Sequence, residues 1–411
     1  MGSEMCIRDR VRIAKADIEE SKVSKTSIMP TGLANSLTSQ EFVDLVTYLE
    51  TLGRRKNQFG QGVSGPVTLA DGFKLTTVAS GLSGATALEI ADDGRIFVCE
   101  QHGALRVVKN GQLLEEPFFK IPVEMNWERG LIGVTVAPNF PTDPHVYVVY
   151  VTDRPHTHHR ISRFRADGDV AVADSEEILF RGDDQSKFGG HVPAGHQGGG
   201  IHFGPDGKLY VGLGEQTAKT PSQRMDALQG KILRINPDGT IPSDNPFMKE
   251  TTGKYQAIWA KGCRNPFTFA FNKSGEMLIN DVGGKFEEIN RGIAGANYGW
   301  PTVDHGPAKR DGFVDPIHIY PQSSINGGDF SPASWPEKLR NKYFFADFNQ
   351  GWVRYIDPKS SEKSHEFISG IRRPVDIRFA PDGSLYILLR NAWVVDDKFV
   401  GGTSSLMRIS R

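Results

Sequence analysis

Cysteine is scarce in this sequence, and long apolar runs are absent from it. The three cysteines, Cys6, Cys99 and Cys263, lie far apart, so neither a disulfide framework nor a C-x-x-C metal pair is expected. No apolar run approaches the roughly 18 to 20 residues that a membrane-spanning helix needs, and residues 1–30 lack the charged-then-apolar layout of a secretory signal. The sequence therefore predicts no transmembrane segment.

An excess of one charge is also missing. The 48 Lys and Arg residues balance 49 Asp and Glu residues, which gives a net charge of -1. No general attraction to phosphate backbones or anionic membranes follows, and nucleic acid is not an expected partner. The chain also has no G-x-S-x-G elbow, P-loop or G-x-G-x-x-G turn, which argues against serine-hydrolase and nucleotide-dependent chemistry.

Glycine, proline and aromatic residues are plentiful. The 45 Gly, 24 Pro, 24 Phe and 10 Tyr among 411 residues favour many short strands over long helices. From about Val67 onward, an alternating apolar strand, a turn of the P-D-G or D-D-G type and a second apolar strand recur. The copies are TALEIADDGRIFVCE, GVTVAPNFPTDPHVYVVYV, GIHFGPDGKLYVGLGE, TFAFNKSGEMLINDV and DIRFAPDGSLYILL, with a looser sixth, SPASWPEKLRNKYFFADFNQGWVRYI.

Six such strand pairs predict an all-β, six-bladed β-propeller over residues 67–411, since radial repetition protects sheet edges. Strand pairs with generic turns also fill a large β-sandwich. Repetition over about 300 residues without intervening helical segments favours the propeller.

Residues 1–55 follow a different pattern. In LTSQEFVDLVTYLETLG the apolar residues recur with helical spacing. Thr38 or Ser39 would cap the N-terminus of this helix, and Gly53 would end it. A short helical segment is therefore expected, joined to the propeller by a Gly-, Gln- and Asn-rich linker at residues 56–66.

The segment GHVPAGHQGGGIHFGPDGKLYVGLGEQ holds the first candidate for chemistry. His196 precedes a glycine run that opens a strand, and these glycines would let a flat ligand approach the backbone. The unperturbed imidazole pKa of about 6.5 suits a general base, and Glu215, at the end of the same strand pair, could orient the ring. The alternative is a loop histidine with a structural hydrogen bond.

Two further clusters could bind a ligand or a metal. WAKGCRNPFTFAF places Arg264 and Asn265 at the entrance to a strand, where arginine offers a planar fork of donors for a carboxylate; the alternative is a surface ion pair. NDVGGKFEEINRGIAGANYGWP contains Glu287 and Glu288, which carry the oxygen ligands that calcium prefers; the alternative is a solvated acidic turn.

A third cluster consists of histidines. The run PHTHHR brings His156, His158 and His159 together. No neighbouring Cys, Asp or Glu completes a zinc ligand set. We therefore interpret these residues as loop or surface histidines.

Four motifs follow one another along the chain: ERGLIGVTVAPNF, GHQGGGIHFGPDGKLYVGLGEQ, CRNPFTFAF and EEINRGIAGANYGWP. In this order they resemble the glucose/sorbosone dehydrogenase family of soluble aldose dehydrogenases, which use pyrroloquinoline quinone (PQQ). The resemblance covers Gly72 to Arg411. It implies oxidation of the C1 hydroxyl of an aldose to the lactone, with the quinone as electron sink.

The resemblance also implies roles for individual residues. His196 matches the base that takes the C1 hydroxyl proton, and Glu215 falls where the family often has an aspartate beside that histidine. Glu128 lies at a polar position that faces substrate and quinone. Arg264 and Asn265 match positions that contact the cofactor.

Three positions depart from the family pattern. Asn349 stands where the soluble glucose enzymes carry a cofactor-binding lysine, and of two arginines in a late loop only Arg373 matches, with Val375 at the other position. Gly195 replaces an acidic neighbour of the histidine. Because each lost charge-assisted hydrogen bond costs about 1.5–3 kcal/mol, weaker binding of the tricarboxylate quinone is expected.

Calcium is the metal that the resemblance implies. Backbone carbonyls near Val282 and Gly283 align with those that hold the cofactor's calcium ion. Glu287 and Glu288 align with side chains of a structural calcium site.

The N-terminal piece SIMPTGLANSLTSQEFVDLVTYLETLG resembles the end of a c-type cytochrome, with Met29 as the axial haem ligand. The C-x-x-C-H attachment motif is missing, so covalent haem is not expected in this chain. The opening MGSEMCIRDR fits neither part, which suggests a truncated chain. A longer parent protein would pass electrons from quinone to a haem c, with a cytochrome or quinone as acceptor, in the periplasm or outside the cell.

Two other functions stay open at this point. A non-catalytic propeller that acts as a binding module is consistent with the missing lysine and arginine. A calcium-dependent lactonase-type hydrolase would need carboxylates that converge on the central channel to hold the metal and activate water. No such convergence is visible in the sequence.

Overall fold

The computed structural model describes residues 66–304, 311–390 and 401–411. They belong to the second of the two units into which the chain divides, residues 57–411. The cytochrome-like segment expected at residues 1–55, with Met29, lies outside the described residues, and it stays a prediction together with the linker. Within the described ranges no helix is long and apolar enough to cross a membrane.

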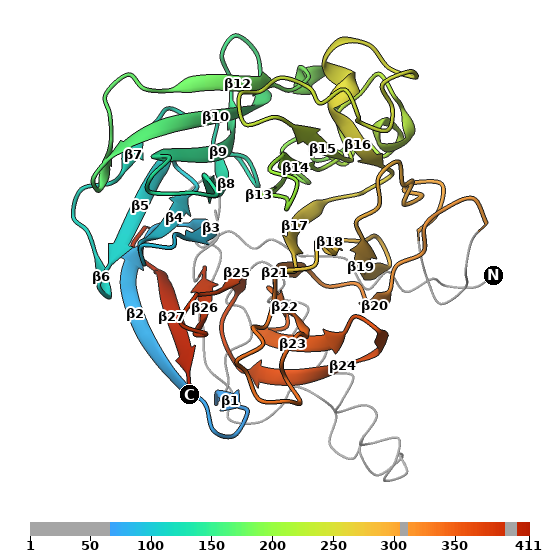
Figure 1. Cartoon of the computed structure of the whole chain (residues 1–411). Helices are drawn as coiled ribbons and strands as arrows, with labels where there is room; N and C mark the ends of the chain where they lie inside the picture. Colours follow the sequence, from blue (N-terminus) through green and yellow to red (C-terminus); the bar gives the residue numbers. More distant parts are fainter. Residues whose placement is uncertain (1–65, 305–310, 391–400) are drawn as a thin grey trace, which may run out of the picture. The chain divides into compact units, whose positions relative to one another are not determined.

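Six sheets make up the described part of the chain, and they are arranged in a ring (Figure 1). The first sheet contains β3 (Ala85–Ile90), β4 (Ile96–Glu100), β5 (Ala104–Lys109), β6 (Gln112–Leu113) and β7 (Phe119–Lys120). The second contains β8 (Leu131–Val136), β9 (His145–Thr152), β10 (His158–Asp167), β11 (Val170–Ala171) and β12 (Glu177–Arg181). The third contains β13 (Gly198–Phe203), β14 (Leu209–Leu213), β15 (Lys231–Ile235) and β16 (Ile258–Lys261).

The remaining sheets complete the ring. The fourth contains β17 (Pro266–Phe271), β18 (Met277–Asp281), β19 (Phe286–Arg291) and β20 (His318–Pro321). The fifth contains β21 (Ile325–Phe330), β22 (Tyr343–Asp347), β23 (Trp352–Asp357), β24 (Ser360–Ser369) and β1 (Thr68–Leu69). The sixth contains β25 (Pro374–Phe379), β26 (Leu385–Leu389), β27 (Ser404–Ser410) and β2 (Lys74–Leu82). The helices among the described residues are short 3-10 helices at Gln185–Lys187, Thr220–Gln223 and Gly253–Ala257.

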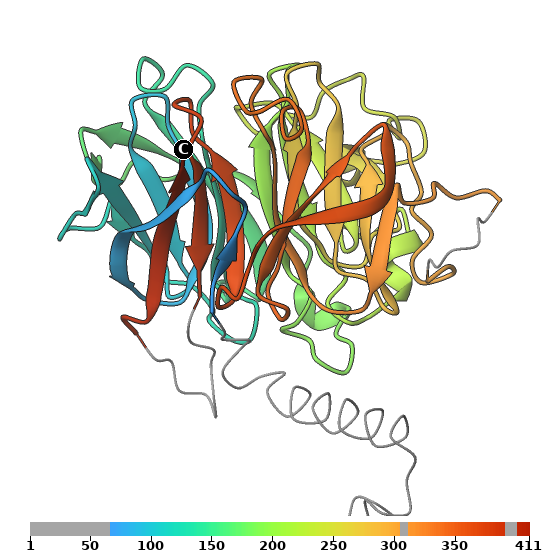
Figure 2. The ribbon, with the colours of Figure 1, turned by 90° about the horizontal axis from the view of Figure 1, so that it is seen from below.

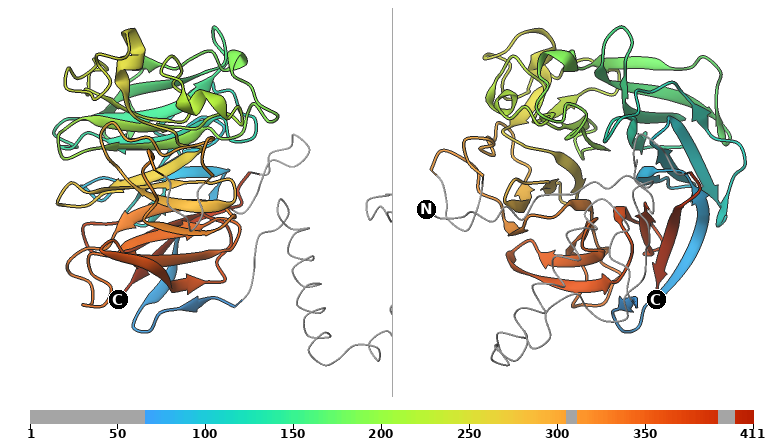
Figure 3. Two further views of the ribbon diagram at one scale, coloured as in Figure 1. Left: turned by 90° about the vertical axis from the view of Figure 1, so that its right-hand side faces the viewer. Right: turned by 180° about the vertical axis from the view of Figure 1, so that it is seen from behind.

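The innermost strands of the six sheets surround a common axis. These strands are β3, β8, β13, β17, β21 and β25, and each contacts the next around the ring, with β25 returning to β3. Figure 3 shows the same sheets from the side and from behind, with connecting loops at both ends of the strands. The predicted six-bladed propeller is therefore confirmed.

The predicted strand pairs coincide with the blades. Five of them are the first and second strands of a blade. The looser sixth copy covers β22 and β23, which are the second and third strands of their blade. Its first strand, β21, was missed because the sequence INGGDF does not alternate apolar and polar residues.

The ring closes through strands from opposite ends of the described chain. β2 pairs antiparallel with β27, and Leu75 lies opposite Ile409. In Figure 2 this early strand, in blue, lies beside the last strand, in red. Both strands of the pair bury apolar residues against β26 and its neighbours, so closure depends on hydrophobic packing as well as on backbone hydrogen bonds.

We expect Ile409→Ala to lower the free energy of unfolding by about 2–5 kcal/mol, because Ile409 is fully buried in the core between the fifth and sixth blades. Urea unfolding followed by circular dichroism measures this loss. Val170→Ala is the matched control, since Val170 is 43% exposed and should lose less than about 0.5 kcal/mol. Equal losses in the two variants would contradict the role of the β2–β27 closure.

Candidate active site

One end of the propeller axis opens into a pocket of about 240 Å³. All six innermost strands contribute to it, through Thr86, Ile132, Gly198, Phe267, Asn326 and Val375. Its wall combines apolar and aromatic side chains with a larger number of polar and charged ones, so it suits a small ligand that carries polar groups.

A histidine–carboxylate pair lies at this pocket. His196 precedes β13 and Glu215 follows β14, so the hairpin brings the two residues together. His196 Nδ1 is 2.5 Å from Glu215 Oε1, and the Glu215 side chain is fully buried while that of His196 is 15% exposed. A Cβ at Gly214 would collide with the His196 carbonyl, which explains why a glycine stands between the strand and the glutamate.

In the His196–Glu215 hydrogen bond the histidine is the donor and the carboxylate is the acceptor. The second carboxylate oxygen of Glu215 accepts a hydrogen bond from the backbone N–H of Lys219, which fixes the carboxylate. Because a carboxylate only accepts hydrogen bonds, His196 donates its Nδ1 proton to it, and in the neutral imidazole the lone pair is then on Nε2. His196 lines the pocket, so this lone pair is available to a ligand there.

Glu128 and Asn265 form a second polar group next to His196. Glu128 Oε2 accepts from the backbone N–H of Gln197 at 3.1 Å and from Asn265 Nδ2 at 3.2 Å. Asn265 Oδ1 in turn accepts from the N–H of Gly198 at 2.8 Å. The two residues at the start of β13 are therefore fixed by side chains from two neighbouring blades.

Asp281 holds the Arg264–Asn265 pair in place. Its carboxylate accepts from the backbone N–H of Arg264 at 2.9 Å and of Asn265 at 2.6 Å. Burial and the nearby Glu288 raise the pKa of Asp281. Our sequence reasoning missed Asp281; the signal was a polar residue at the channel end of the apolar strand β18.

The Arg264 side chain lies along the pocket wall. Its Nη1 donates to the Val282 carbonyl at 2.6 Å, and its guanidinium carbon is 5.4 Å from the centre of the Trp300 ring. Its Nε is buried with no hydrogen-bond partner. A buried donor of this kind suits a ligand acceptor.

The fifth and sixth blades bring Asn349, Arg373 and Val375 to the wall, and also Arg390, which the sequence motifs do not include. Arg373 is buried, with its guanidinium carbon 5.7 Å from the centre of the Phe348 ring. The backbone N–H of Asn349 donates to Asp347 at 3.0 Å. The structure therefore brings the expected residues His196, Glu128, Arg264, Asn265, Arg373 and Asn349 to one pocket, with Glu215 behind His196.

Comparison with known proteins identifies the family. A family model for glucose/sorbosone dehydrogenases matches residues 82–393. The chain belongs to this family. It is 29% identical over 321 residues to the aldose sugar dehydrogenase YliI of Escherichia coli, covering 71% of this chain and 85% of that protein. It is 28% identical over 265 residues to quinoprotein glucose dehydrogenase B of Acinetobacter calcoaceticus, covering 57% and 53%.

Solved structures agree with this assignment. A putative oxidoreductase (glucose dehydrogenase) from Thermus thermophilus superimposes with a TM-score of 0.71 at 26% identity, covering 82% of this chain and all of that one. The soluble aldose sugar dehydrogenase of Escherichia coli, in its apo-form, gives a TM-score of 0.70 at 25% identity, covering 82% and 99%. These relatives support a sugar dehydrogenase.

The calcium residues expected for this glucose/sorbosone dehydrogenase family member lie in different surroundings. Val282 lines the pocket, and Gly283 must be glycine because a Cβ would collide with the Phe286 carbonyl. Glu287 and Glu288 are both buried and, as neighbours in β19, point to opposite faces of the sheet. In the part of the chain that the structure describes, no three His, Cys, Asp or Glu residues gather as metal ligands.

Glu287 has a structural task in this arrangement. Its two oxygens accept from the backbone N–H groups of Ser323 at 2.7 Å and Ile325 at 3.1 Å, where β21 begins. Burial raises its pKa from 4.5 to about 8. The calcium site at Glu287 and Glu288 thus stays a prediction.

The interpretation of the histidine run as loop or surface residues was wrong for two of the three. His156 is exposed, but His158 and His159 are buried in β10. His159 Nε2 is 3.0 Å from the Gln197 carbonyl, and burial lowers its pKa to about 4. Neutral His159 therefore supports the residue next to His196, a role that PHTHHR does not reveal because it lacks apolar alternation.

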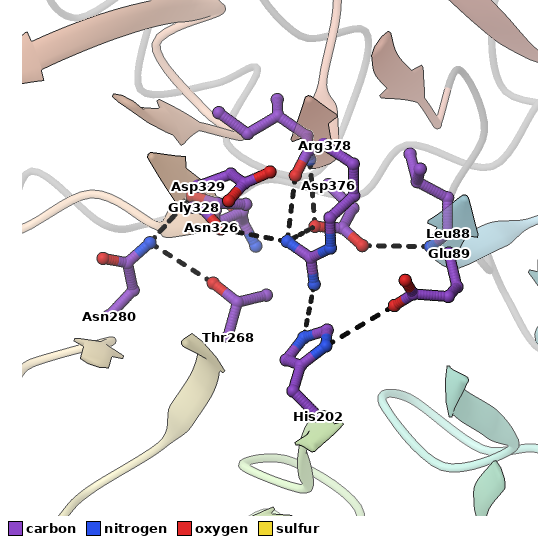
Figure 4. Close-up of polar contacts among 12 residues, drawn as sticks. Leu88, Glu89, His202, Thr268, Asn280, Asn326, Gly328, Asp329, Asp376 and Arg378 are labelled. Atoms are coloured by element: carbon purple, nitrogen blue, oxygen red, sulfur yellow. Dashed lines mark hydrogen bonds and ion pairs between the residues drawn. The ribbon is translucent and has the colours of Figure 1, made fainter. Parts of the chain in front are cut away.

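A buried polar cluster fills the axis beyond the pocket (Figure 4). Arg378 donates to the Gly328 carbonyl at 2.9 Å, lies 3.3 Å from Asp376 and contacts His202 Nε2 at 2.5 Å. Burial and Arg378 lower the pKa of His202, so this imidazole is neutral. A cavity of only about 10 Å³ remains there, and it shares Thr86, Ile132 and Phe267 with the wall of the pocket.

We expect Glu287→Gln to flatten the pH dependence of stability. The folded-state pKa of Glu287 is raised to about 8, so its contribution is fully present below about pH 4.5 and is lost as pH rises towards 8. Glu287 therefore makes the free energy of unfolding fall with pH across pH 5–8, and the variant should remove up to about 1.4 kcal/mol per pH unit of this contribution.

Urea unfolding in EDTA at several pH values measures this difference. Glu177→Gln is the control, because that side chain is 54% exposed. An unchanged slope in Glu287→Gln would contradict the raised pKa. Repeating the series with calcium tests the predicted metal site: calcium bound to the Glu287 carboxylate would make the wild-type slope shallower.

Proposed function

We propose that this chain oxidises the C1 hydroxyl of an aldose to the lactone, with PQQ as electron acceptor. The observation that carries the proposal is the His196–Glu215 pair, with a 2.5 Å contact, beside a pocket whose wall holds Arg264 and Arg373. A positioned base and a site for an anionic acceptor are the two parts that such an oxidation needs. Relatives named as aldose sugar dehydrogenase and quinoprotein glucose dehydrogenase support it.

His196 is the base in this proposal. Its Nε2 takes the proton of the C1 hydroxyl, while Glu215 keeps the ring in position and stabilises the imidazolium that forms. The C1 hydrogen and its two electrons leave the sugar, which becomes the lactone. When bound, the quinone supplies the acceptor for that hydrogen and those electrons.

The residues of the pocket fit a planar quinone with three carboxylates. Arg264 offers a buried Nε donor without a partner, and Arg373 offers a second guanidinium on another blade. Phe267 and Phe348 supply flat apolar surface. The fold is also shared with a PQQ-bound aldose sugar dehydrogenase of Streptomyces coelicolor, with a TM-score of 0.69 at 24% identity.

Calcium, the electron acceptor and the location belong to the same proposal. The carbonyls of Val282 and Gly283 would hold the calcium ion of the cofactor. Electrons would pass on to a cytochrome, in keeping with the cytochrome-like pattern of residues 1–55, and the protein would act in the periplasm or outside the cell. No covalent haem is expected in this chain, since the attachment motif is missing.

The test is reduction of an artificial dye by purified protein with PQQ and calcium, across a panel of aldoses. We expect wild type to be active and His196→Ala to lose on the order of 10²–10⁴-fold in kcat. His145→Ala is the matched control, because His145 forms another histidine–carboxylate pair, with Asp143, outside the pocket. Equal activity in His196→Ala and wild type would contradict the assignment of the base.

The Glu215→Gln variant separates positioning from chemistry. The amide keeps the shape of the side chain but not its charge, so the imidazolium is less stabilised. We expect kcat to fall on the order of 10- to 100-fold while the affinity for PQQ is kept. A wild type that neither binds PQQ nor reduces dye with any aldose would instead favour a binding module.

A further inference from the structure

Arg390 lies at the pocket although no family motif of the sequence includes it. It is the first residue after β26 (Leu385–Leu389), and its backbone N–H donates to the Arg373 carbonyl at 2.9 Å. Residues that face each other across two antiparallel strands project to the same side. Both arginines accordingly line the pocket, although 17 positions separate 373 from 390 in the sequence.

The surroundings of Arg390 are buried. The residue is 4% exposed, and its Nη2 donates to Gln101 Oε1 at 2.5 Å. Its Nη1 lies 3.5 Å from the carbonyls of Gly84 and Ala85. Burial, followed by the charge of Arg373, lowers the pKa of Arg390 to about 10, and Glu128 opposes this shift. The two guanidiniums lie on one wall of the pocket, so an anion bound there is attracted by both charges.

Val375 leaves this part of the wall without the second arginine of the family motif. The register between β25 and β26 shifts between Pro374 and Asp376, so Val375 is the extra residue of a bulge. It reaches the pocket with an apolar side chain, at the position where the family motif has its second arginine. Arg390 comes from the adjacent strand end and brings a guanidinium to the same part of the wall.

We propose that Arg390, with Arg373, binds a carboxylate of the quinone and so replaces the arginine that the family motif has at Val375. This inference rests on the proposed function, because it takes PQQ as the ligand of the pocket. It assigns three guanidiniums, those of Arg264, Arg373 and Arg390, to the pocket of a tricarboxylate. The positive charge lost by having Asn349 and Val375 in place of the family's lysine and arginine is then partly restored by Arg390.

Direct binding of PQQ tests the proposal without any need for turnover. Titration with PQQ in the presence of calcium, followed by tryptophan fluorescence or calorimetry, gives the Kd of each variant. We expect Arg390→Gln to bind on the order of 10- to 100-fold more weakly than wild type, as for loss of one charge-assisted contact. Arg390→Lys keeps the charge without the planar fork and should fall between them.

A control separates this role from a structural one. Arg408→Gln removes a guanidinium from β27 of the same blade, where Arg408 pairs with Asp382, and should leave the Kd of PQQ unchanged. The melting temperature without quinone reports whether each variant is folded. A purely structural role for Arg390 would lower that temperature and leave the Kd of the folded protein unchanged.

The outcomes are distinguishable. If wild type binds PQQ and Arg390→Gln binds it equally well, the proposal for Arg390 is wrong while the proposed function stands. If wild type does not bind PQQ, the proposed function itself fails. Should Arg390→Gln not fold, the comparison of Arg390→Lys with wild type decides, and equal Kd values there would overturn the proposal.

Discussion

The unpaired edge of each innermost strand is the constraint on which this structure depends. Every such strand lies at the end of its sheet, so the N–H groups along its axial edge have no carbonyl of a paired strand to bond to. Buried donors of this kind need other partners. Side chains of neighbouring strands supply them. Asp376 accepts from Leu88, Asp329 from Phe379, Glu287 from Ile325, and Asn265 from Gly198. The blades are thus joined by buried polar side chains as well as by apolar packing.

The same constraint positions the candidate active site. The innermost strands begin at the pocket. The side chains that accept hydrogen bonds from their backbone N–H groups therefore also fix the residues around the pocket. Glu128 and Asn265 fix the backbone of Gln197 and Gly198 at the start of β13, next to His196. Asp281 fixes the backbone of Arg264. The geometry of the candidate base and of the anion-binding wall therefore follows from how the propeller satisfies its own backbone.

The sequence contained most of the fold and part of the site. Strand–turn–strand repeats predicted six blades because each hairpin is local, whereas the β2–β27 closure joins distant segments and left no pattern. His196, Arg264 and Asn265 could be predicted from motifs. Arg390 could not, because its place beside Arg373 depends on the register of β25 and β26. The burial of His159 was equally invisible, since polar residues satisfied by partners from other segments carry no local signal.

A crystal structure of the chain with PQQ and calcium tests the central claim most directly. That claim is that the His196–Glu215 pair faces a quinone held by arginines at one end of the propeller axis. We predict that the quinone lies between Arg264 and Arg373, with its carboxylates within hydrogen-bonding distance of guanidiniums and with His196 Nε2 facing the space left for a sugar. A quinone bound elsewhere, or a His196 ring turned away from it, would contradict the account.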